Sequence, residues 1–413
     1  MADKYKGQGQ YQLNKLSLIV SDQSTGQDQE IDLRAVFVDV TIYESMWSVL
    51  MSGAVSIIDS YNMPDVLPLY GDEKLEVEFF TSGNEKNPIS FTGHVYKIDP
   101  PNRISEHSKG YNIHFVSPAG LASERSHVQR GFKTTADAIV KAIHSDHFAN
   151  ASNKRCETSS TIGVHPYTFG SVSPLDAISI VSRDAQSTEG NNAFLFFENN
   201  QTFVWKPLQE LYQQDPVTAF YYRNTGVYKD IKQKNVESFN AIQDFEVLEE
   251  ASFLDRVRDG QHGSQHLYLD LFAKKMVTKT FDRDQQFDPT KSLGDQASKK
   301  PLTNPKYTDR WFIEYVASDI DVRSKGYLSM MGRMVADTFN ARIVTYGDSS
   351  LAAGQTCSVQ LPNWNQDQEN VKSSATGKFL MSEIKHTLSN KDYYQTIMIQ
   401  KDAFANKEKV PDS

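Results

Sequence analysis

The sequence lacks most of the features that mark secreted, membrane-spanning or metal-binding proteins. It has two cysteines, Cys156 and Cys357, which lie far apart and in no ligand-spaced motif. We therefore expect both to be reduced thiols that serve in packing. No apolar run approaches the ~20 residues that span a bilayer, and the polar start of the chain has no apolar region of the signal-peptide kind. We expect a chain that is made and kept in solution unless a partner carries it elsewhere.

The common catalytic and nucleotide-binding motifs are also missing. The sequence contains no GxxxxGKS/T loop, no GxGxxG after a strand, no HExxH and no GxSxG. His144 and His147 stand three residues apart near the end of an expected helix, where the helix dipole alone favours histidine. As a metal pair they lack a third ligand nearby, apart from Asp146. We predict no catalytic residue, no cofactor and no metal.

Two further polar clusters invite a ligand interpretation. His262 and His266 lie in a Gly/Gln/Ser-rich stretch, for which we predict a solvated loop. Asp282, Asp284 and Asp288 resemble a cation-binding loop, but the glycine and terminal glutamate of the EF-hand pattern are missing. We predict a solvated acidic turn there.

The charge balance argues against nucleic-acid binding. The 52 acidic and 43 basic residues give a net charge of −9, and the basic residues are dispersed without interleaved aromatics. Affinity for nucleic acid depends on Lys and Arg displacing counterions, and stacking platforms need aromatic rings. The 23 Phe and 19 Tyr instead favour strands, where such side chains pack on a pleated surface.

Turn-rich joins separate about six predicted strands in the N-terminal part, which is typical of a barrel or sandwich. The predicted strands are 15–20, 31–43, 54–58, 75–80, 91–98 and 111–116. Two helix starts and an aromatic hairpin follow. The signals are Thr134 with Asp137, Ser173 with Pro174 and Asp176, and the aromatic runs 194–197 and 202–205 around Asn199 and Asn200.

The whole chain is predicted to divide into an arm, three domains, an insertion and a tail. The boundaries are 1–10 for a flexible arm, 11–118 for a first β-barrel domain, 119–212 for an α+β domain, 213–254 with 311–404 for a second β-barrel domain, 255–310 for an insertion, and 405–413 for the tail. A methionine-rich helix is predicted at 326–339 within the second barrel domain. We expect its methionines to pack in a core, although such a stripe can also form an adaptable groove.

The sequence also repeats itself. Gly71 and Gly93 are 22 residues apart, Gly354 and Gly377 are 23 apart, and an isoleucine follows each second glycine after 20 residues. Gly71 and Gly354 precede strands after a leucine-bearing turn, where a positive φ is often required. Gly93 and Gly377 are expected to open strands where the chain bends or another backbone approaches. The four glycines are structural turn positions of a duplicated β unit, unless the spacing is a coincidence.

The C-terminal stretch carries a family resemblance. Its methionine-rich helix is followed by 341–348, by the glycine turn and strand 351–359, and by 377–390, which runs into the turn His386-Thr387-Leu388-Ser389. This resembles the central baseplate hub protein of contractile-tailed bacteriophages and the hub portion of type VI secretion spike proteins. The order of domains matches along nearly the whole chain. The stretch departs from the family in that we see no fused spike, lysozyme or needle domain in it, so we expect any spike to be a separate protein.

The resemblance implies a mainly β α+β fold with two similar small β-barrel tube domains, a small α+β domain and an insertion. It implies a homotrimeric, pseudo-sixfold hub in the virion's tail baseplate, assembled in the host bacterial cytoplasm. Expected partners are a separate spike protein below, tail tube or tube-initiator proteins above and baseplate wedge proteins. Genomic DNA would pass through without specific binding, past an acidic wall, and no stable membrane insertion is expected.

Two other functions stay open at this stage. A tail-associated cell-wall hydrolase could hide its active site in 255–310 or in the α+β domain, and a carbohydrate-binding β protein would also fit the strand-rich sequence.

Overall fold

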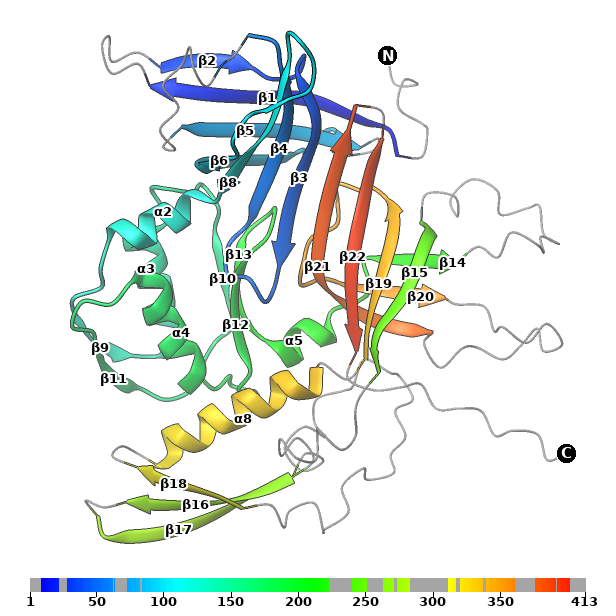
Figure 1. Ribbon diagram of the computed structural model, residues 1–413. Helices are drawn as coiled ribbons and strands as arrows, with labels where there is room; N and C mark the ends of the chain where they lie inside the picture. Colours follow the sequence, from blue (N-terminus) through cyan, green and yellow to red (C-terminus); the bar gives the residue numbers. More distant parts are fainter. Residues whose placement is uncertain are drawn as a thin grey trace, which may run out of the picture.

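The protein is mainly β, with helices gathered on one side of a long, curved sheet (Figure 1). This confirms the predicted mainly β α+β fold. The computed structural model describes residues 9–21, 28–61, 63, 73–81, 84–222, 240–250, 263–270, 273–282, 311–316, 320–336, 339–360, 376–390 and 392–401.

The N-terminal strands form one end of that sheet. They are β1 (Tyr11–Ser21), β2 (Asp28–Asp32), β3 (Phe37–Ser45), β4 (Ser52–Asp59), β5 (Lys74–Thr81), β6 (Ile89–Ile98), β7 (Asn102–Arg103) and β8 (Lys109–Val116). In β5, the alternating residues Leu75, Val77 and Phe79 are buried in the core, as the period-two pattern requires. The single strand predicted at 31–43 is wrong, because a turn at Leu33 separates β2 from β3.

The middle of the chain forms a small α+β domain. Its elements are α2 (Pro118–Arg125), β9 (Gly131–Thr134), α3 (Ala136–His147), β10 (Cys156–Thr158), β11 (His165–Thr168), α4 (Pro174–Asp184), β12 (Phe194–Glu198), β13 (Phe203–Pro207) and α5 (Leu208–Gln213). The predicted start of α4 is confirmed, because Ser173 Oγ accepts a hydrogen bond from Asp176 N (3.2 Å). The aromatic hairpin is also confirmed as β12 and β13.

The C-terminal strands close into a barrel. They are β14 (Thr218–Tyr222), β15 (Ala241–Glu250), β19 (Phe339–Tyr346), β20 (Thr356–Gln360), β21 (Gly377–Ser389) and β22 (Tyr393–Lys401). Neighbours pair in the order β21-β20-β14-β15-β19-β22, and β22 pairs back with β21. Ile343, Ile397 and Phe379 are buried inside this barrel.

Five strands of the first sheet and five of the barrel are arranged in the same order. The first sheet runs β5-β6-β8-β4-β3 and the barrel runs β20-β21-β22-β19-β15, with every neighbouring pair antiparallel. Equivalent bulges interrupt β6 between Val95 and Lys97 and β21 between Met381 and Glu383. The two units differ at β1, which is antiparallel to β5, whereas β14 is parallel to β20.

A separate three-stranded sheet and a helix lie between β15 and β19 in the chain. They are β16 (Gly263–Asp270), β17 (Lys275–Asp282), β18 (Trp311–Val316) and α8 (Ile320–Ala336). We predicted that residues from 311 onward belong to the second barrel, and this is wrong for β18, which pairs in parallel with β16. Tyr327 and Met331 of α8 pack on Phe281 of β17. In Figure 1, α8 lies between this sheet and helices α4 and α5. Within the described residues, no helix is long and apolar enough to cross a membrane.

Candidate functional site

The first sheet and the barrel are joined by a strand pairing, and this seam is the candidate functional site. Strand β3 runs antiparallel to β21 from the pair Ser45 and Glu383 to the pair Asp39 and Ser389. Ser45 Oγ also donates to Glu383 Oε1 (2.9 Å). Because β21 belongs to the barrel and β3 to the first sheet, the seam fixes the orientation of one unit against the other.

A buried polar network lies behind the seam. Glu44 of β3 is fully buried, and its Oε1 accepts a hydrogen bond from His386 Nε2 (3.0 Å). His386 Nδ1 accepts from the Tyr393 hydroxyl (2.7 Å), which burial holds in its protonated form by raising its pKa well above the usual value. Glu44 Oε2 accepts from Ala353 N (3.1 Å), and Gln395 Nε2 donates to the Tyr393 hydroxyl (2.9 Å). A carboxylate can only accept, so Nε2 carries the imidazole hydrogen.

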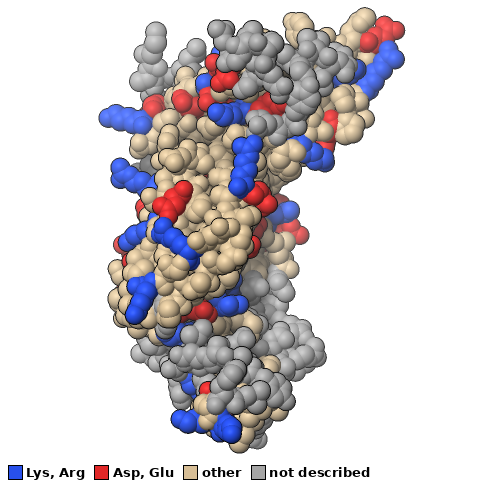
Figure 2. All heavy atoms as spheres, turned by 90° about the vertical axis from the view of Figure 1, so that its left-hand side faces the viewer, with Lys and Arg blue, Asp and Glu red and all other residues tan. Residues whose placement is uncertain are grey.

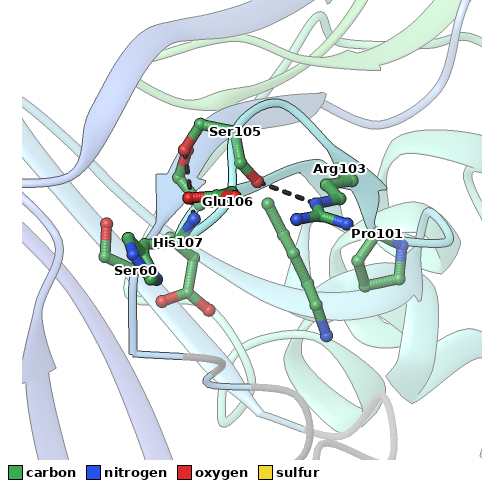
Figure 3. Close-up of a pocket in the computed structure, with 9 residues that line it drawn as sticks. Ser60, Pro101, Arg103, Ser105, Glu106 and His107 are labelled. Carbon is green, nitrogen blue, oxygen red and sulfur yellow. Dashed lines mark hydrogen bonds between the residues drawn. The ribbon is translucent and has the colours of Figure 1, made fainter.

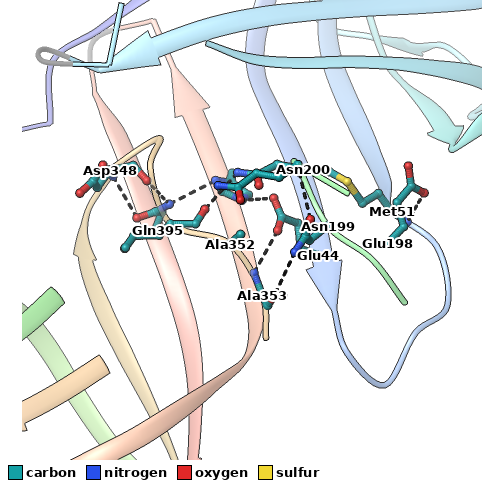
Figure 4. A network of polar contacts seen from close by, with 12 residues as sticks. Glu44, Met51, Glu198, Asn199, Asn200, Asp348, Ala352, Ala353 and Gln395 are labelled. Atoms are coloured by element: carbon teal, nitrogen blue, oxygen red, sulfur yellow. Dashed lines mark hydrogen bonds and ion pairs between the residues drawn. The ribbon is translucent and has the colours of Figure 1, made fainter. Parts of the chain in front are cut away.

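The α+β domain is attached at the same place by the tip of its hairpin (Figure 4). Asn199 Nδ2 donates to the carbonyl oxygen of Ala353 (3.2 Å), and Asn200 Nδ2 donates to that of Leu351 (3.0 Å). The segment around Ala353 therefore contacts the first sheet through Glu44 and the α+β domain through Asn199. Three parts of the chain meet at one turn.

An ion pair inside the α+β domain also contacts the first sheet, through Met51 and Phe91. Lys154 Nζ lies 2.8 Å from Oε1 of the buried Glu198 and donates to the carbonyl oxygen of Asn199 (2.7 Å). Met51 N donates to Glu198 Oε2 (3.3 Å), and Lys154 Nζ lies 5.5 Å from the centre of the Phe91 ring. The buried Glu198 carboxylate accepts from both Lys154 Nζ and Met51 N, and these hydrogen bonds offset the free-energy cost of burying its charge.

The first sheet, the barrel and the α+β domain meet around the turn at Ala353, and we call this region the junction. Of the four predicted turn glycines, Gly354 lies in the junction. Its φ is +86°, and a Cβ placed on it would lie 2.5 Å from Cζ of Phe197 in β12. Its N–H donates to the carbonyl oxygen of Met381 (2.9 Å). Both the backbone conformation and the approach of the Phe197 ring require glycine here.

The other three glycines have different surroundings. Gly377 is the first residue of β21, has a φ of +137° and has open space where a Cβ would lie. Gly93 lies inside β6 and does not open that strand, and a Cβ there would lie 2.8 Å from Phe115 Cδ2. Gly93 lies two residues before Val95 at the bulge of β6, whereas Gly377 lies four residues before Met381 at the bulge of β21, so the two glycines do not occupy equivalent positions in the two units. Gly71 lies outside the described residues.

The histidines considered as ligands are enclosed by aromatic rings or hydrogen-bonded to hydroxyls. His144 packs 5.2 Å from the Phe203 ring, and burial lowers its pKa. His147 Nδ1 lies 3.0 Å from Ser126 Oγ. The predicted solvated loop is wrong for His266, which is buried in β16 because α8 covers that face of the sheet.

The acidic triplet yields no cation site in the part of the chain that the structure describes. Asp282 ends β17, whereas Asp284, Asp288 and also His262 lie outside the described residues. Among described residues, no three His, Cys, Asp or Glu side chains are grouped to hold a metal ion.

A polar hollow of about 510 Å³ lies beside the loop between β7 and β8 (Figure 3). Arg103 Nε donates to the carbonyl oxygen of Ser105 (3.1 Å), and the hydroxyls of Ser105 and Ser108 share a hydrogen bond (2.6 Å). The hydrogen bond at Asp59 Oδ2 from the buried Tyr111 hydroxyl (3.2 Å) serves the core. These contacts fold the loop, and they bring no base to a nucleophile.

Charges of both signs are interspersed over the helical side of the molecule (Figure 2). Arg130 pairs with Asp146 (2.9 Å), and Lys141 pairs with Asp137 (3.5 Å) one helical turn away. The described residues on this face form no continuous basic stripe of the kind that binds nucleic acid.

The chain shares its fold with phage tail proteins. The tail protein from Neisseria meningitidis MC58 superposes with a TM-score of 0.54 at 10% identity, over 94% of this chain and 97% of that chain. The 43 kDa tail protein of prophage MuSo2 from Shewanella oneidensis gives a TM-score of 0.54 at 8% identity, over 93% and 97%. No protein-family model and no curated protein matches the sequence. The resemblance to phage tail proteins predicted from the sequence is thus confirmed at the level of the fold.

Proposed function

We propose that this protein is the structural hub of a phage tail baseplate. In this proposal three chains form a pseudo-sixfold ring that joins the tail tube to a separate spike protein and leaves a channel for DNA. The ring is part of the virion and is assembled in the host bacterial cytoplasm. Baseplate wedge proteins surround it, and tail tube or tube-initiator proteins lie above it.

The observation that carries the proposal is the repeated strand order of the two β units. A chain with two similar units joined by a fixed seam contributes two of the six positions in a ring, so a threefold assembly can face a sixfold tube. The shared fold with phage tail proteins along nearly the whole chain supports the same assignment.

The proposal assigns no catalysis to the chain. Its polar networks hold domains together, with buried donors and acceptors that serve each other. Such networks add rigidity and orientation, which a part that transmits force between a tube and a spike requires.

The mass in solution and the shape of particles test the proposal. We expect light scattering to give the mass of three chains, and negative-stain images of the purified ring or of isolated tails to show threefold symmetry with an open centre. A cell-wall degradation assay on the same sample should give no activity. A ring with another number of chains, or activity lost on mutation of one residue, would contradict the hub.

A further inference from the structure

Each of the two strands that form the seam has a structural counterpart in the other β unit. The strand order makes β15 the counterpart of β3, and it makes β6 the counterpart of β21. In the chain, β3 pairs with β21. The counterpart strands β15 and β6 lie on opposite sides of Figure 1 and do not meet within one chain.

Among the residues that the structure describes, no strand pairs with either counterpart strand along the edge where the internal seam would lie. Strand β15 pairs with β14 only at Ala241 and Ile242, and its later described residues pair only with β19. Strand β6 pairs with β5 up to His94, and beyond its bulge the described pairing is with β8. Open strand edges are templates for pairing with another chain.

Side-chain exposure differs between the edge of β3, which is paired in the seam, and the corresponding edge of β15. Ile42 of β3 pairs with Gly53 and is fully buried. Its counterpart Val247 of β15 pairs with Ala341, yet 42% of it is exposed. The adjacent Leu248 is 45% exposed. These two apolar side chains lie on an edge that can pair with another strand, so they are available to pack against a second chain.

We propose that the open edge of β15 docks on the open edge of β6 in a second copy of this chain, and so repeats the β3 to β21 seam between subunits. The inference rests on the proposed function and names its subunit contact. The contact joins two different surfaces, so each copy gives one edge and receives one. It closes into a ring if every contact repeats the rotation of the internal seam.

The internal register assigns the residues that face each other. Ile42 lies opposite His386 in the internal seam. His386 lies two residues beyond Ile384, which pairs with Ile397 as Ile98 pairs with Ile113. Counting two residues beyond Ile98 gives Pro100 as the counterpart of His386, so Val247 of one copy should lie opposite Pro100 of the next.

The contact between subunits should be weaker than the internal seam. Pro100 and Pro101 have no N–H to donate, so fewer ladder hydrogen bonds can form there. Prolines on an edge also limit pairing with wrong partners. Docking then depends on side chains such as Val247 and Leu248, and it is favoured when partners raise the local concentration.

Cysteine cross-linking of the full chain tests the register. The variant Val247→Cys with Pro100→Cys, oxidised at high protein concentration, should give covalent dimers and trimers and no longer ladder. The matched control is Val247→Cys with Tyr96→Cys. This control keeps the cysteine at position 247 and places the second cysteine four residues earlier in the chain, at position 96 on the same exposed edge. It should therefore give little cross-linked product. The native Cys357 is buried, and burial raises the pKa of Cys156 to about 12, so both should react slowly.

The possible results distinguish failure of the proposed β15–β6 contact between subunits, called the seam in this paragraph, from failure of the proposed hub function. A protein with the mass of three chains that fails to cross-link at Val247 and Pro100 would overturn the seam and leave the hub standing. Equal cross-linking of the control pair, or ladders beyond three chains, would also overturn it. A chain that stays single and uncross-linked overturns the seam, and images of tails then decide the hub. Val247→Asp should weaken self-association on the order of tenfold while circular dichroism stays unchanged.

Discussion

At the scale of single residues, Glu44 connects more of the molecule than any one sequence motif does. Its two oxygens accept from His386 of β21 and from the backbone of Ala353, whose carbonyl oxygen in turn holds Asn199. A buried carboxylate is stable only while its donors are in place. Glu44 therefore adds to the β3–β21 strand pairing a buried polar contact that joins the barrel, the first sheet and the α+β domain.

Replacement of Glu44 by Ala should lower the free energy of unfolding by about 3 kcal/mol, because two buried donors lose their acceptor. Denaturation in urea measures the change. Glu106→Ala removes an exposed carboxylate and should change stability by less than about 0.5 kcal/mol. If the two variants proved equally stable, the network would not be holding the junction.

Gly354 allows the effects of backbone strain and of crowding to be separated. Gly354→Ala should cost about 3 kcal/mol, because it adds strain at positive φ to a clash with the Phe197 ring. Gly190 also has a positive φ, of +90°, but has open space where a Cβ would lie. Gly190→Ala should therefore cost only about 1 kcal/mol. Thermal or urea unfolding of both variants measures the difference, and equal losses would show that Phe197 can move aside.

His144 should make the protein sensitive to mild acid. Burial lowers the pKa of His144, and its Nε2 has no hydrogen-bond partner in the described structure. The unfolded chain then binds this proton at a higher pH than the folded chain does. The stability is present above about pH 6.5 and is lost as the pH falls, by at most about 1.4 kcal/mol per pH unit for one proton.

The variant His144→Phe keeps an aromatic ring beside Phe148 and Phe203 and removes the titration. Urea unfolding at about pH 7.5 and about pH 5.5 should show a smaller loss for the variant than for the wild type. The exposed His107 offers a control, since His107→Phe should keep the wild-type pH dependence. An unchanged loss in His144→Phe would assign the acid sensitivity to other groups.

At the scale of elements, the small sheet β16 to β18 is held to the molecule by α8. The ring centres of Tyr327 and His266 lie 3.9 Å apart, and the Tyr327 hydroxyl accepts from Ser264 Oγ (2.6 Å). Tyr327→Ala should cost roughly 3–5 kcal/mol locally. Hydrogen exchange should become faster in β16 and β17 and stay slow in β19 and β22. Tyr61→Ala, at a residue 78% exposed, should change neither, and a uniform change across the chain would show that the two parts unfold together.

The elements that the sequence predicted are those with local signals. Strand β5 shows alternation in Leu75, Val77 and Phe79, and α4 begins at a serine cap followed by proline. Strand β18 could be predicted at 311–316, but its place in a separate sheet could not, because β16 pairs with β18 across a long segment and the buried face of β16 depends on rings from α8. His266 therefore looked like part of a solvated loop.

The junction was predictable only in part, for the same physical reason. Gly354 could be singled out because a positive φ leaves a trace in composition and spacing. Glu44 could not, since it is one of 52 acidic residues and its partner His386 is 342 residues away. Long-range pairing of polar groups depends on the final fold and has no periodic pattern in the sequence.

At the scale of the whole molecule, the net charge determines whether the surface attracts or repels nucleic acid. The chain carries a net charge of −9, and the described helical face mixes both signs. A protein with this net charge repels phosphates weakly, and its dispersed cations do not form a cluster that would exchange with condensed counterions.

The purified protein should therefore not retard double-stranded DNA in a gel at physiological salt, and lowering the salt should not produce a shifted band. The proposed DNA channel would need this property, because each protein cation bound to a phosphate would slow the passage of the DNA. A basic protein of similar size, run beside it, should shift the same DNA and shift it more strongly as salt is lowered. A shift by this protein that grows as salt is lowered would mean that its cations gather on one surface, and the acidic wall would then have to be abandoned.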